Sequence, residues 1–394
     1  MQAAYQRFVG FWLLITLAGL MAVAAFNMLV DPAGAFPAWH LKAFEPLRYL
    51  NYDRVHKAEM ARRGGWEIII LGSSRSQAGF PATHPFLAAK PTCNLSLNGA
   101  KFPELAPVFD YARRHNPLKH VILCVDLYMF SSGSRWIEDF PESRFSPSFA
   151  PFDYYCKRLL GRASTGDAWD TLRQKCKHYT PPPQTRYGFY DTRLGPGTSQ
   201  RELFSRVMRM LGAGYRHQTL DPSDLELFRH VVRVCRDRKI DLQVVIMPVH
   251  ALDLELLYAG GRWAEFEKWK TDLVKALAEE GVEGQFNLWD FTGYAGPPAE
   301  TVPPEGDLKS RMKYYFENSH CTPVLGGIML DAMFGATGTN TFGVKLDRSN
   351  LNAHLARILA DRADYARTNA SEIRWAQGII ADISSKPSGS GQRK

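Results

Sequence analysis

Residues 66–74 read WEIIILGSS. Four aliphatic side chains follow Glu67, so both faces of the segment are apolar, as is typical of a strand buried within a parallel sheet. The glycine and the two serines that end the run are turn-forming residues. The segment is therefore predicted to be a core strand that ends at Gly72. Ser74 is then predicted to lie at the carboxyl edge of the sheet, where α/β folds bind their ligands.

Strand and helix patterns alternate after this segment. Residues 120–126 read HVILCVD, an apolar strand pattern that ends at Asp126, and residues 103–115 before it are helical in character. Strand, helix and strand at these spacings predict an α/β fold with a doubly wound, mostly parallel sheet. Further predicted strands are 93–97, 242–247 and 286–289, and further predicted helices are 221–238, 262–280 and one that follows Pro323.

The alternation breaks between residues 131 and 220, where proline, arginine and aromatic residues are frequent. We interpret this stretch as a largely helical insertion that covers or faces the substrate site. Composition and pattern together predict the domain organisation: a linker over 31–64, an α/β domain over 65–340 with the insertion at 131–220, a C-terminal helical extension over 341–383, and a disordered tail over 384–394.

A membrane-spanning segment is predicted near the N-terminus. Residues 8–30 contain no charged side chain, and about 20 apolar residues suffice for a helix to cross a bilayer core. A cleaved signal peptide would have a shorter apolar region and a cleavage site with small residues, whereas Asn27 to Asp31 form a poor site. We therefore favour an uncleaved anchor. The basic residues around it do not decide which side of the membrane the rest of the chain occupies.

Composition excludes several classes of protein. Hydrophobic residues make up 45% of the 394 residues and charged residues 22%, which excludes disorder for most of the chain. The chain has 48 Lys and Arg against 40 Asp and Glu, a net charge of +8, but without a long basic run. Nucleic acid is therefore not an expected partner. A thinly spread positive charge fits an anionic membrane or an acidic polymer.

The six cysteines do not have the spacing of a metal site. Neither a CxxC pair nor a Cys/His ligand spacing occurs, so we predict no metal and no cofactor. Cys124 and Cys235 lie in apolar runs and are predicted to be buried thiols. Cys156 and Cys176 lie in the irregular segment and could pair outside the cytoplasm, which the sequence leaves open.

Two short motifs contain candidate catalytic residues. Ser74 follows the first core strand, where a turn can expose its hydroxyl and aim backbone N–H groups at an anion. Late in the chain, Glu317 precedes His320 by three residues on a predicted loop, so the carboxylate can orient the imidazole while the imidazole accepts a proton from a serine. The alternative interpretations are an ordinary turn at Ser74 and a solvated polar loop at residues 314–323.

Taken together, the two motifs resemble the SGNH/GDSL hydrolase superfamily, over residues 65–335 with 131–220 as an insertion. The resemblance implies a three-layer, flavodoxin-like α/β fold. GSS at 72–74 matches the first block of the family, which implies Ser74 as nucleophile and oxyanion donor. NLSLNGA at 94–100 matches the second block and implies Gly99 in the oxyanion hole. ENSH at 317–320 matches the last block, with His320 as base and Glu317 in place of the usual aspartate.

This sequence departs from the family pattern at the third block. Asp126 stands where the family has an asparagine, and an ionised aspartate cannot donate a hydrogen bond to an oxyanion. Either the hole uses another donor, such as the side chain of Asn98, or acyl transfer is weakened. If Asp126 occupies the oxyanion position, replacing it with Asn should raise activity. A role in capping local amides at the strand end is the alternative.

Two nearby residues have open roles. Arg75 follows the predicted nucleophile and could bind a carboxylate or phosphate of an acidic substrate. An ion pair with a neighbouring acid is an equal alternative. His250 ends a predicted strand at the same sheet edge. It is a substitute for His320 as the base, although a hydrogen-bonded structural histidine is the better interpretation.

The GSS form of the serine block, the single anchor and the late acid–histidine pair resemble membrane-attached SGNH-like proteins of bacterial envelopes that help to acylate polymers. The resemblance implies a single-pass inner-membrane protein with a periplasmic esterase or O-acyltransferase domain, most simply for O-acetyl groups. It also implies a cell-envelope polymer or exopolysaccharide as substrate and a membrane-bound acyltransferase as a partner. The alternative is a catalytically inactive SGNH scaffold that binds polymer or partner enzymes.

Overall fold

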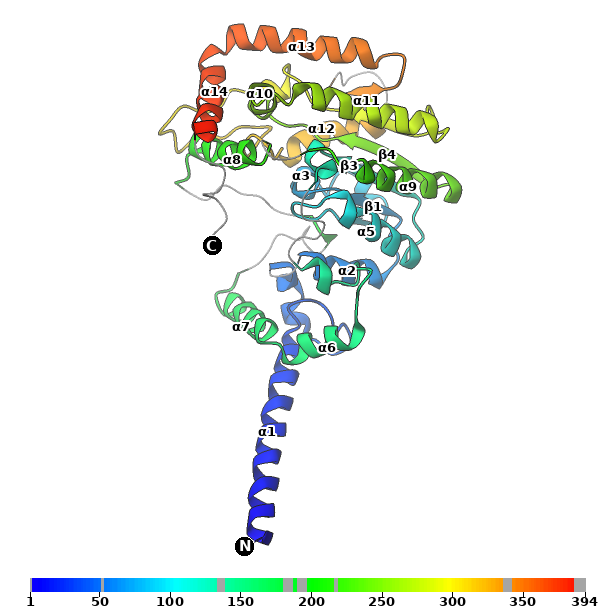
Figure 1. Cartoon of the computed structure of the whole chain (residues 1–394). Helices are drawn as coiled ribbons and strands as arrows, with labels where there is room; N and C mark the ends of the chain where they lie inside the picture. Colours follow the sequence, from blue (N-terminus) through cyan, green and yellow to red (C-terminus); the bar gives the residue numbers. More distant parts are fainter. Residues whose placement is uncertain are drawn as a thin grey trace. The chain divides into compact units, whose positions relative to one another are not determined.

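The structure is a computed structural model, shown in Figure 1. It describes residues 2–50, 53–132, 139–179, 187–189, 197–215, 219–335 and 342–385. The chain divides into two compact units. The first contains residues 1–64 and 136–188, and the second contains residues 65–135 and 189–394.

The second unit contains a six-stranded sheet in the order β2-β1-β3-β4-β5-β6. The first five strands are parallel and β6 pairs antiparallel with β5, so the predicted α/β fold with a mostly parallel sheet is confirmed. The strands are β1 (Ile68–Leu71), β2 (Thr92–Asn94), β3 (His120–Val125), β4 (Asp241–Ile246), β5 (Asn287–Asp290) and β6 (Val344–Leu346).

The strand order reverses at β1. The chain leaves β1 for β2 on one side and then returns to β3 on the other side. The carboxyl ends of β1 and β3 therefore flank the point at which doubly wound sheets bind ligands. Ser74 lies three residues beyond the end of β1, and Asp126 directly follows β3. The topology thus brings two of the predicted site residues to one edge of the sheet.

Helices connect and cover the strands of this unit. α5 packs on α9, α9 on α11, α3 on α12, and α10 on both α8 and α14. The helices are α3 (Ser74–Gly79), α4 (Pro85–Ala88), α5 (Phe102–His115), α8 (Gln200–Tyr215), α9 (Pro222–Arg238), α10 (Ala251–Ala259), α11 (Trp263–Glu279), α12 (Pro323–Phe334), α13 (Leu351–Thr368) and α14 (Ala370–Ser385), with short 3₁₀ turns at η2 (Leu127–Phe130) and η5 (Pro297–Ala299).

Glycine permits close packing around the first strand. A Cβ atom at Gly72 would lie 2.8 Å from Cβ of Cys124 and would collide with the hydroxyl of Ser76. A Cβ atom at Gly326 would collide with the carbonyl oxygen of Gly79, where α12 crosses α3. Both glycines therefore let backbone segments approach around the turn that carries Ser74.

The C-terminal extension joins the sheet, which the sequence did not predict. β6 lies within the predicted helical extension 341–383 and forms the edge of the sheet. His354 of α13 bonds Asp290 at 2.8 Å, and the ammonium group of Lys270 lies 2.6 Å from the same carboxylate. Burial alone would raise the pKa of Asp290, but Lys270 and His354 hold it well below its ordinary value. This charged cluster ties α13 to the end of β5.

The first unit combines two segments that the sequence analysis treated separately. The predicted linker 31–64 contains helices rather than irregular chain, and residues 139–179 of the predicted insertion pack with it and with α1. The second part of the insertion, α8, belongs to the unit that contains the sheet. The elements of the first unit are α1 (Gln2–Val30), η1 (Lys42–Leu50), α2 (Asp53–Arg63), η3 (Phe140–Glu142), α6 (Pro151–Leu160) and α7 (Arg162–Cys176).

Within the described residues, α1 is the one helix that is long and apolar enough to cross a membrane. Most of its residues are exposed in the structure, and only Asn27 and Val30 near its end are buried. Of the cysteines, Cys124 and Cys235 are buried, as predicted, whereas Cys156 and Cys176 are exposed free thiols. The predicted tail 384–394 lies outside the described residues, except for the last two residues of α14.

Candidate active site

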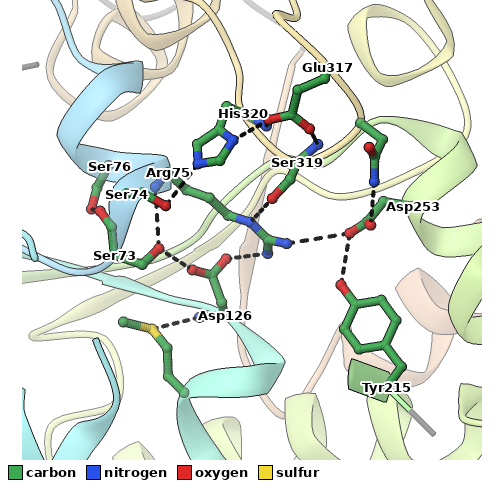
Figure 2. Close-up of polar contacts among 12 residues, drawn as sticks. Ser73, Ser74, Arg75, Ser76, Asp126, Tyr215, Asp253, Glu317, Ser319 and His320 are labelled. Atoms are coloured by element: carbon green, nitrogen blue, oxygen red, sulfur yellow. Dashed lines mark hydrogen bonds and ion pairs between the residues drawn. The ribbon is translucent and has the colours of Figure 1, made fainter. Parts of the chain in front are cut away.

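Ser74 is the first residue of α3 and lies directly after the turn that ends β1 (Figure 2). Ser73 is the N-cap of this helix, and its hydroxyl accepts a bond from the N–H of Arg75 at 3.3 Å. From Ile68 to Phe80, Ser74 alone is not buried. The turn therefore presents one hydroxyl to solvent from an otherwise buried segment.

The loop before α12 brings His320 to this hydroxyl. Nε2 of His320 lies 2.8 Å from Oγ of Ser74, and Nδ1 contacts the carboxylate of Glu317. Tyr315 and Cys321 pair as an isolated antiparallel bridge, which closes the loop between them. The predicted geometry, with Ser74 in hydrogen-bond reach of His320 and Glu317 on the other side of the imidazole, is confirmed.

Glu317 is held in place as an acceptor. Its side chain is buried and accepts bonds from the backbone N–H groups of Ser319 at 2.7 Å and His320 at 3.1 Å. Burial alone would raise the pKa of Glu317, but the imidazole of His320 and the Ser319 N–H hold it below its ordinary value. Because the ionised carboxylate only accepts, Nδ1 of His320 carries the proton and Nε2 accepts the hydroxyl proton of Ser74.

Arg75 has a different role from the predicted contact with substrate. Its side chain is buried, and its guanidinium lies 2.6 Å from Asp126 and 3.4 Å from Asp253. Its Nε donates to the hydroxyl of Ser319 at 2.9 Å. Although burial opposes the charge, the two carboxylates raise the pKa of Arg75 well above its ordinary value. Each of the three guanidinium nitrogens thus has a partner within the protein. Because these partners include Asp126 and Ser319, Arg75 links the end of β3 to the loop of Glu317 and His320.

The carboxylate of Asp126 likewise contacts protein groups. One of its oxygens accepts from Arg75 at 2.6 Å, and the other accepts from the hydroxyl of Ser73 at 2.7 Å. The residue is 2% exposed. Both oxygens are therefore used to hold Ser73 and Arg75, and the oxyanion role of Asp126 stays a prediction. Asp126 positions the two residues on either side of Ser74 in the sequence.

The second predicted block lies in a turn beyond β2. Asn98 is exposed and Gly99 has a φ of 63°, a conformation that glycine adopts without strain. The N–H of Leu97 donates to the carbonyl of Gly72 at 2.9 Å, so this turn begins beside the turn that carries Ser74. Both predicted oxyanion residues are thus on the same edge of the sheet as Ser74.

Several residues that support the site were missed by sequence reasoning. Asp253 lies on α10 and is 1% exposed, and it accepts bonds from Asn318 at 2.8 Å and from the hydroxyl of Tyr215 at 3.1 Å (Figure 2). Burial raises the pKa of Asp253 to about 6. Gln200 of α8 also donates to the carbonyl of Tyr315 at 2.8 Å. These partners come from distant segments, and no local pattern in the sequence pointed to them.

His250 is structural, as its better interpretation predicted. It is fully buried, its Nε2 lies 2.7 Å from the carbonyl of Glu300, and its Nδ1 accepts from the N–H of Leu252 at 3.2 Å. The backbone N–H of His250 donates to the carbonyl of Asn318 at 2.9 Å. Burial lowers the pKa of His250 to about 4. The residue caps α10 and fastens the loop of His320.

A pH dependence of stability follows from His250. Its folded-state pKa of about 4 lies below the ordinary value of 6.5, so the unfolded chain binds a proton more readily between these two pH values. Folding stability from this residue is therefore complete above pH 6.5 and falls as the pH decreases to 4, by about 3 kcal/mol at 1.36 kcal/mol per unit.

We expect the His250→Gln substitution to reduce the loss of folding stability between pH 6.5 and pH 4. Glutamine can retain a donor and an acceptor without titrating. The measurement is urea unfolding of both proteins at pH 7.5 and pH 4.5, with the difference between the proteins compared at each pH. An equal difference at both values would contradict the assignment.

A small cavity lies behind the ion pair. It borders Arg75 and Asp126, is lined further by Leu254, Phe266 and Trp269, and has a volume of about 20 Å³. That space is sufficient for about one water molecule. Ser74 and His320 do not line this cavity, which is therefore separate from the surface that the serine presents.

Comparisons with protein-family models, with curated proteins and with solved structures gave no match. In the part of the chain that the structure describes, no group of three or more His, Cys, Asp or Glu side chains could hold a metal ion. The fold and the site therefore define a class by geometry alone: an α/β protein with a serine, a histidine and a carboxylate in hydrogen-bonded order at the carboxyl edge of its sheet.

Proposed function

We propose that this protein is a serine-dependent ester hydrolase or O-acyltransferase with an SGNH-like, three-layer α/β fold. The observation that carries the proposal is the continuous chain of contacts from Ser74 through His320 to the buried Glu317. A nucleophile in contact with a base, which is itself oriented by a third group, is the arrangement that nucleophilic catalysis requires.

The reaction begins with attack by Oγ of Ser74 on an ester carbonyl carbon, while Nε2 of His320 takes the hydroxyl proton. A tetrahedral intermediate forms and carries the negative charge on the former carbonyl oxygen. It collapses when His320 returns the proton to the leaving alcohol, and the acyl group remains on Ser74. Glu317 stabilises the imidazolium while it holds the proton.

The oxyanion needs donors other than Asp126. Ser74 is the first residue of α3, and the N–H groups of a first helical turn have no acceptor within the helix. We propose the backbone N–H of Ser74 as one donor. Donor groups in the turn at Asn98 and Gly99 are the others. Backbone donors fixed before the reaction are effective because they do not reorient during it.

The second half of the reaction transfers the acyl group to an acceptor hydroxyl. His320 removes the proton from water or from a sugar hydroxyl, the new oxygen attacks the acyl carbon, and Oγ of Ser74 leaves with the proton. The proposed acyl group is acetyl, which is the group that the resemblance to envelope O-acetylation proteins implies. A polymeric acceptor in the envelope can reach the partly exposed hydroxyl of Ser74.

We further propose that the α/β unit lies outside the cytoplasm, anchored by α1. A C-terminal alkaline phosphatase fusion should therefore be active, and the protein should stay with membranes after high-salt and carbonate washes. The same fusion with a cytoplasmic reporter should be inactive. An active cytoplasmic reporter beside an inactive phosphatase would contradict the orientation.

The second candidate function is a non-catalytic scaffold that binds an envelope polymer or a partner enzyme. The observation that favours it is Asp126, which occupies the place of a family oxyanion donor and has both oxygens bound to Ser73 and Arg75. A scaffold does not need a reactive serine. Reactivity of Ser74 therefore separates the two functions.

The test is covalent labelling of the purified full chain with a fluorophosphonate. We expect one adduct, on Ser74, because this reagent reacts with serines that a neighbouring base activates. The adduct is located by peptide mass spectrometry, and ester turnover is assayed with a small chromogenic acetyl ester. An unlabelled Ser74 in a folded protein would support the scaffold function instead.

Glu317→Gln tests the third member of the chain of contacts. We expect ester turnover to fall by about 10²- to 10⁴-fold, because glutamine neither fixes the tautomer of His320 nor stabilises the imidazolium. Fluorophosphonate labelling of Ser74 should slow in parallel. Glu300→Gln is the control on the neighbouring loop, since the side chain of Glu300 accepts from the N–H groups of Lys313 and Tyr314 and not from His320, and its backbone carbonyl contact with His250 is unaffected by the substitution. Equal turnover in the Glu317 variant and the wild type would exclude an orienting role.

A further inference from the structure

The end of α1 is joined to two helices of the first unit. Asn27 is 1% exposed, and its amide nitrogen donates to the carbonyl of Leu159 at 2.8 Å and to the hydroxyl of Thr165 at 2.9 Å. Leu159 is near the end of α6 and Thr165 is near the start of α7. The junction between α6 and α7 is therefore fixed at the level of Asn27 along α1.

The part of the uncharged stretch from Phe8 to Asn27 is about as long as the core of a bilayer is thick. From Phe8 to Asn27 there are 20 residues, and a helix rises about 1.5 Å per residue, which gives about 30 Å. The hydrocarbon core of a bilayer is also about 30 Å thick. If α1 crosses a membrane, with Phe8 at one boundary, then Asn27 lies at the other boundary.

Apolar side chains that the protein leaves exposed gather at this level. Leu160 at the junction is 46% exposed, and Trp169 of α7 is 50% exposed although its ring lies 6.4 Å from the ring of Phe26. Val30 and Ala168 are buried in a common cluster beside them. An exposed tryptophan next to a buried contact with a membrane-spanning helix is typical of the interfacial layer of a bilayer.

Positive charges accompany these side chains. Basic side chains are exposed between Trp169 and the residues that follow α7: Arg173, Lys175 and Lys177. Arg173 also lies 3.4 Å from the exposed Asp170, so this segment contains one ion pair among its basic side chains. Arg162 at the start of α7 is also exposed. Basic side chains beside exposed aromatic residues match the phosphate groups of a lipid surface in charge and position.

We propose that α6 and α7 lie in the headgroup layer of the membrane that α1 crosses. Leu160 and Trp169 enter the boundary with the hydrocarbon, and the basic side chains of α7 contact lipid phosphates. The occupant of this exposed surface is the bilayer itself, because the surface is continuous with α1. The inference depends on α1 crossing the membrane and not on the chemistry of Ser74.

The experiment measures depth in the full chain reconstituted in vesicles of phosphatidylcholine and phosphatidylglycerol. Cys156 and Cys176 are replaced with Ser, and the four remaining cysteines are buried and do not react under native conditions. A fluorescent NBD label is then attached at Leu160→Cys, at Trp169→Cys or, as a deep reference, at Leu17→Cys in α1. Each label is quenched by doxyl lipids with shallow or deep quenchers and by aqueous iodide.

Labels at 160 and 169 should respond at least about threefold more to the shallow than to the deep doxyl lipid, and iodide should quench them at least about threefold less than free label. The label at 17 should respond most to the deep quencher. Thermal unfolding that matches the unlabelled protein establishes that each variant is folded. Quenching of both 160 and 169 by iodide to the level of free label, without an effect of doxyl lipid, would overturn the proposal.

Discussion

Ser74→Ala should remove ester turnover almost entirely, with a loss of about 10⁴- to 10⁶-fold in kcat, as expected when the nucleophile of such a group is deleted. The fluorophosphonate adduct should also be absent. Stability should change little, because Ser74 is partly exposed and its side-chain contact is with the similarly exposed His320. His320→Ala should lose turnover by a similar factor, because both residues act in the same proton transfer.

The control for this prediction is Ser223→Ala. Ser223 is an exposed serine in the first turn of α9, where it bonds Asp221, and it should leave turnover and labelling unchanged. Unimpaired turnover of the acetyl ester by Ser74→Ala would show that the reaction, if present, uses another nucleophile. Unchanged acylation of envelope polymer in cells that carry only the Ser74→Ala protein would contradict the proposed function in the cell.

Asp126→Asn should destabilise the protein rather than activate it. Family resemblance alone predicts a gain, because asparagine would restore an oxyanion donor. The structure reverses that expectation, since Asp126 neutralises the buried Arg75 and accepts from Ser73. Removal of one charge from a buried pair costs about 3–5 kcal/mol, and the lower end applies because Asp253 still contacts Arg75. Turnover should fall as well, because Ser73 and Arg75 flank Ser74.

The measurement is urea unfolding of wild type and Asp126→Asn at pH 7, followed by turnover of the acetyl ester under conditions where both proteins are folded. Asp241→Asn is the matched control, because Asp241 begins β4 and pairs with His120 while 38% exposed. An exposed pair contributes at most about 1 kcal/mol. Higher turnover by Asp126→Asn with unchanged stability would restore the oxyanion role.

The parallel sheet could be predicted from local pattern. The apolar runs at 68–71 and 121–125 are buried in the structure, and each predicted strand from 66–71 to 286–289 corresponds to an observed strand. β6 was missed because Val344–Leu346 is a short edge strand with an exposed lysine at its centre. Its pairing depends on β5, which lies more than 50 residues earlier in the chain.

Local sequence patterns also could not predict the division of the chain into two units. The position of residues 31–64 between the anchor and the first core strand predicts a linker. In the structure they pack with residues 139–179, and Asp31 is buried against Arg48 at 2.8 Å. Burial raises the pKa of Asp31 to about 6. Contacts between segments that are about 100 residues apart leave no periodic signal in either segment.

At the site, short-range sequence patterns account for the chemical groups, and contacts between distant segments account for their roles. The turn after a buried strand placed Ser74 at a sheet edge, and the spacing of Glu317 and His320 put a carboxylate beside an imidazole. Both follow from short-range geometry. Arg75 and Asp126 had two roles open from sequence. Only the fold, which surrounds Arg75 with Asp126, Asp253 and Ser319 from three separate segments, assigned both to positioning, because a buried charge is stable only where oppositely charged or polar groups meet it.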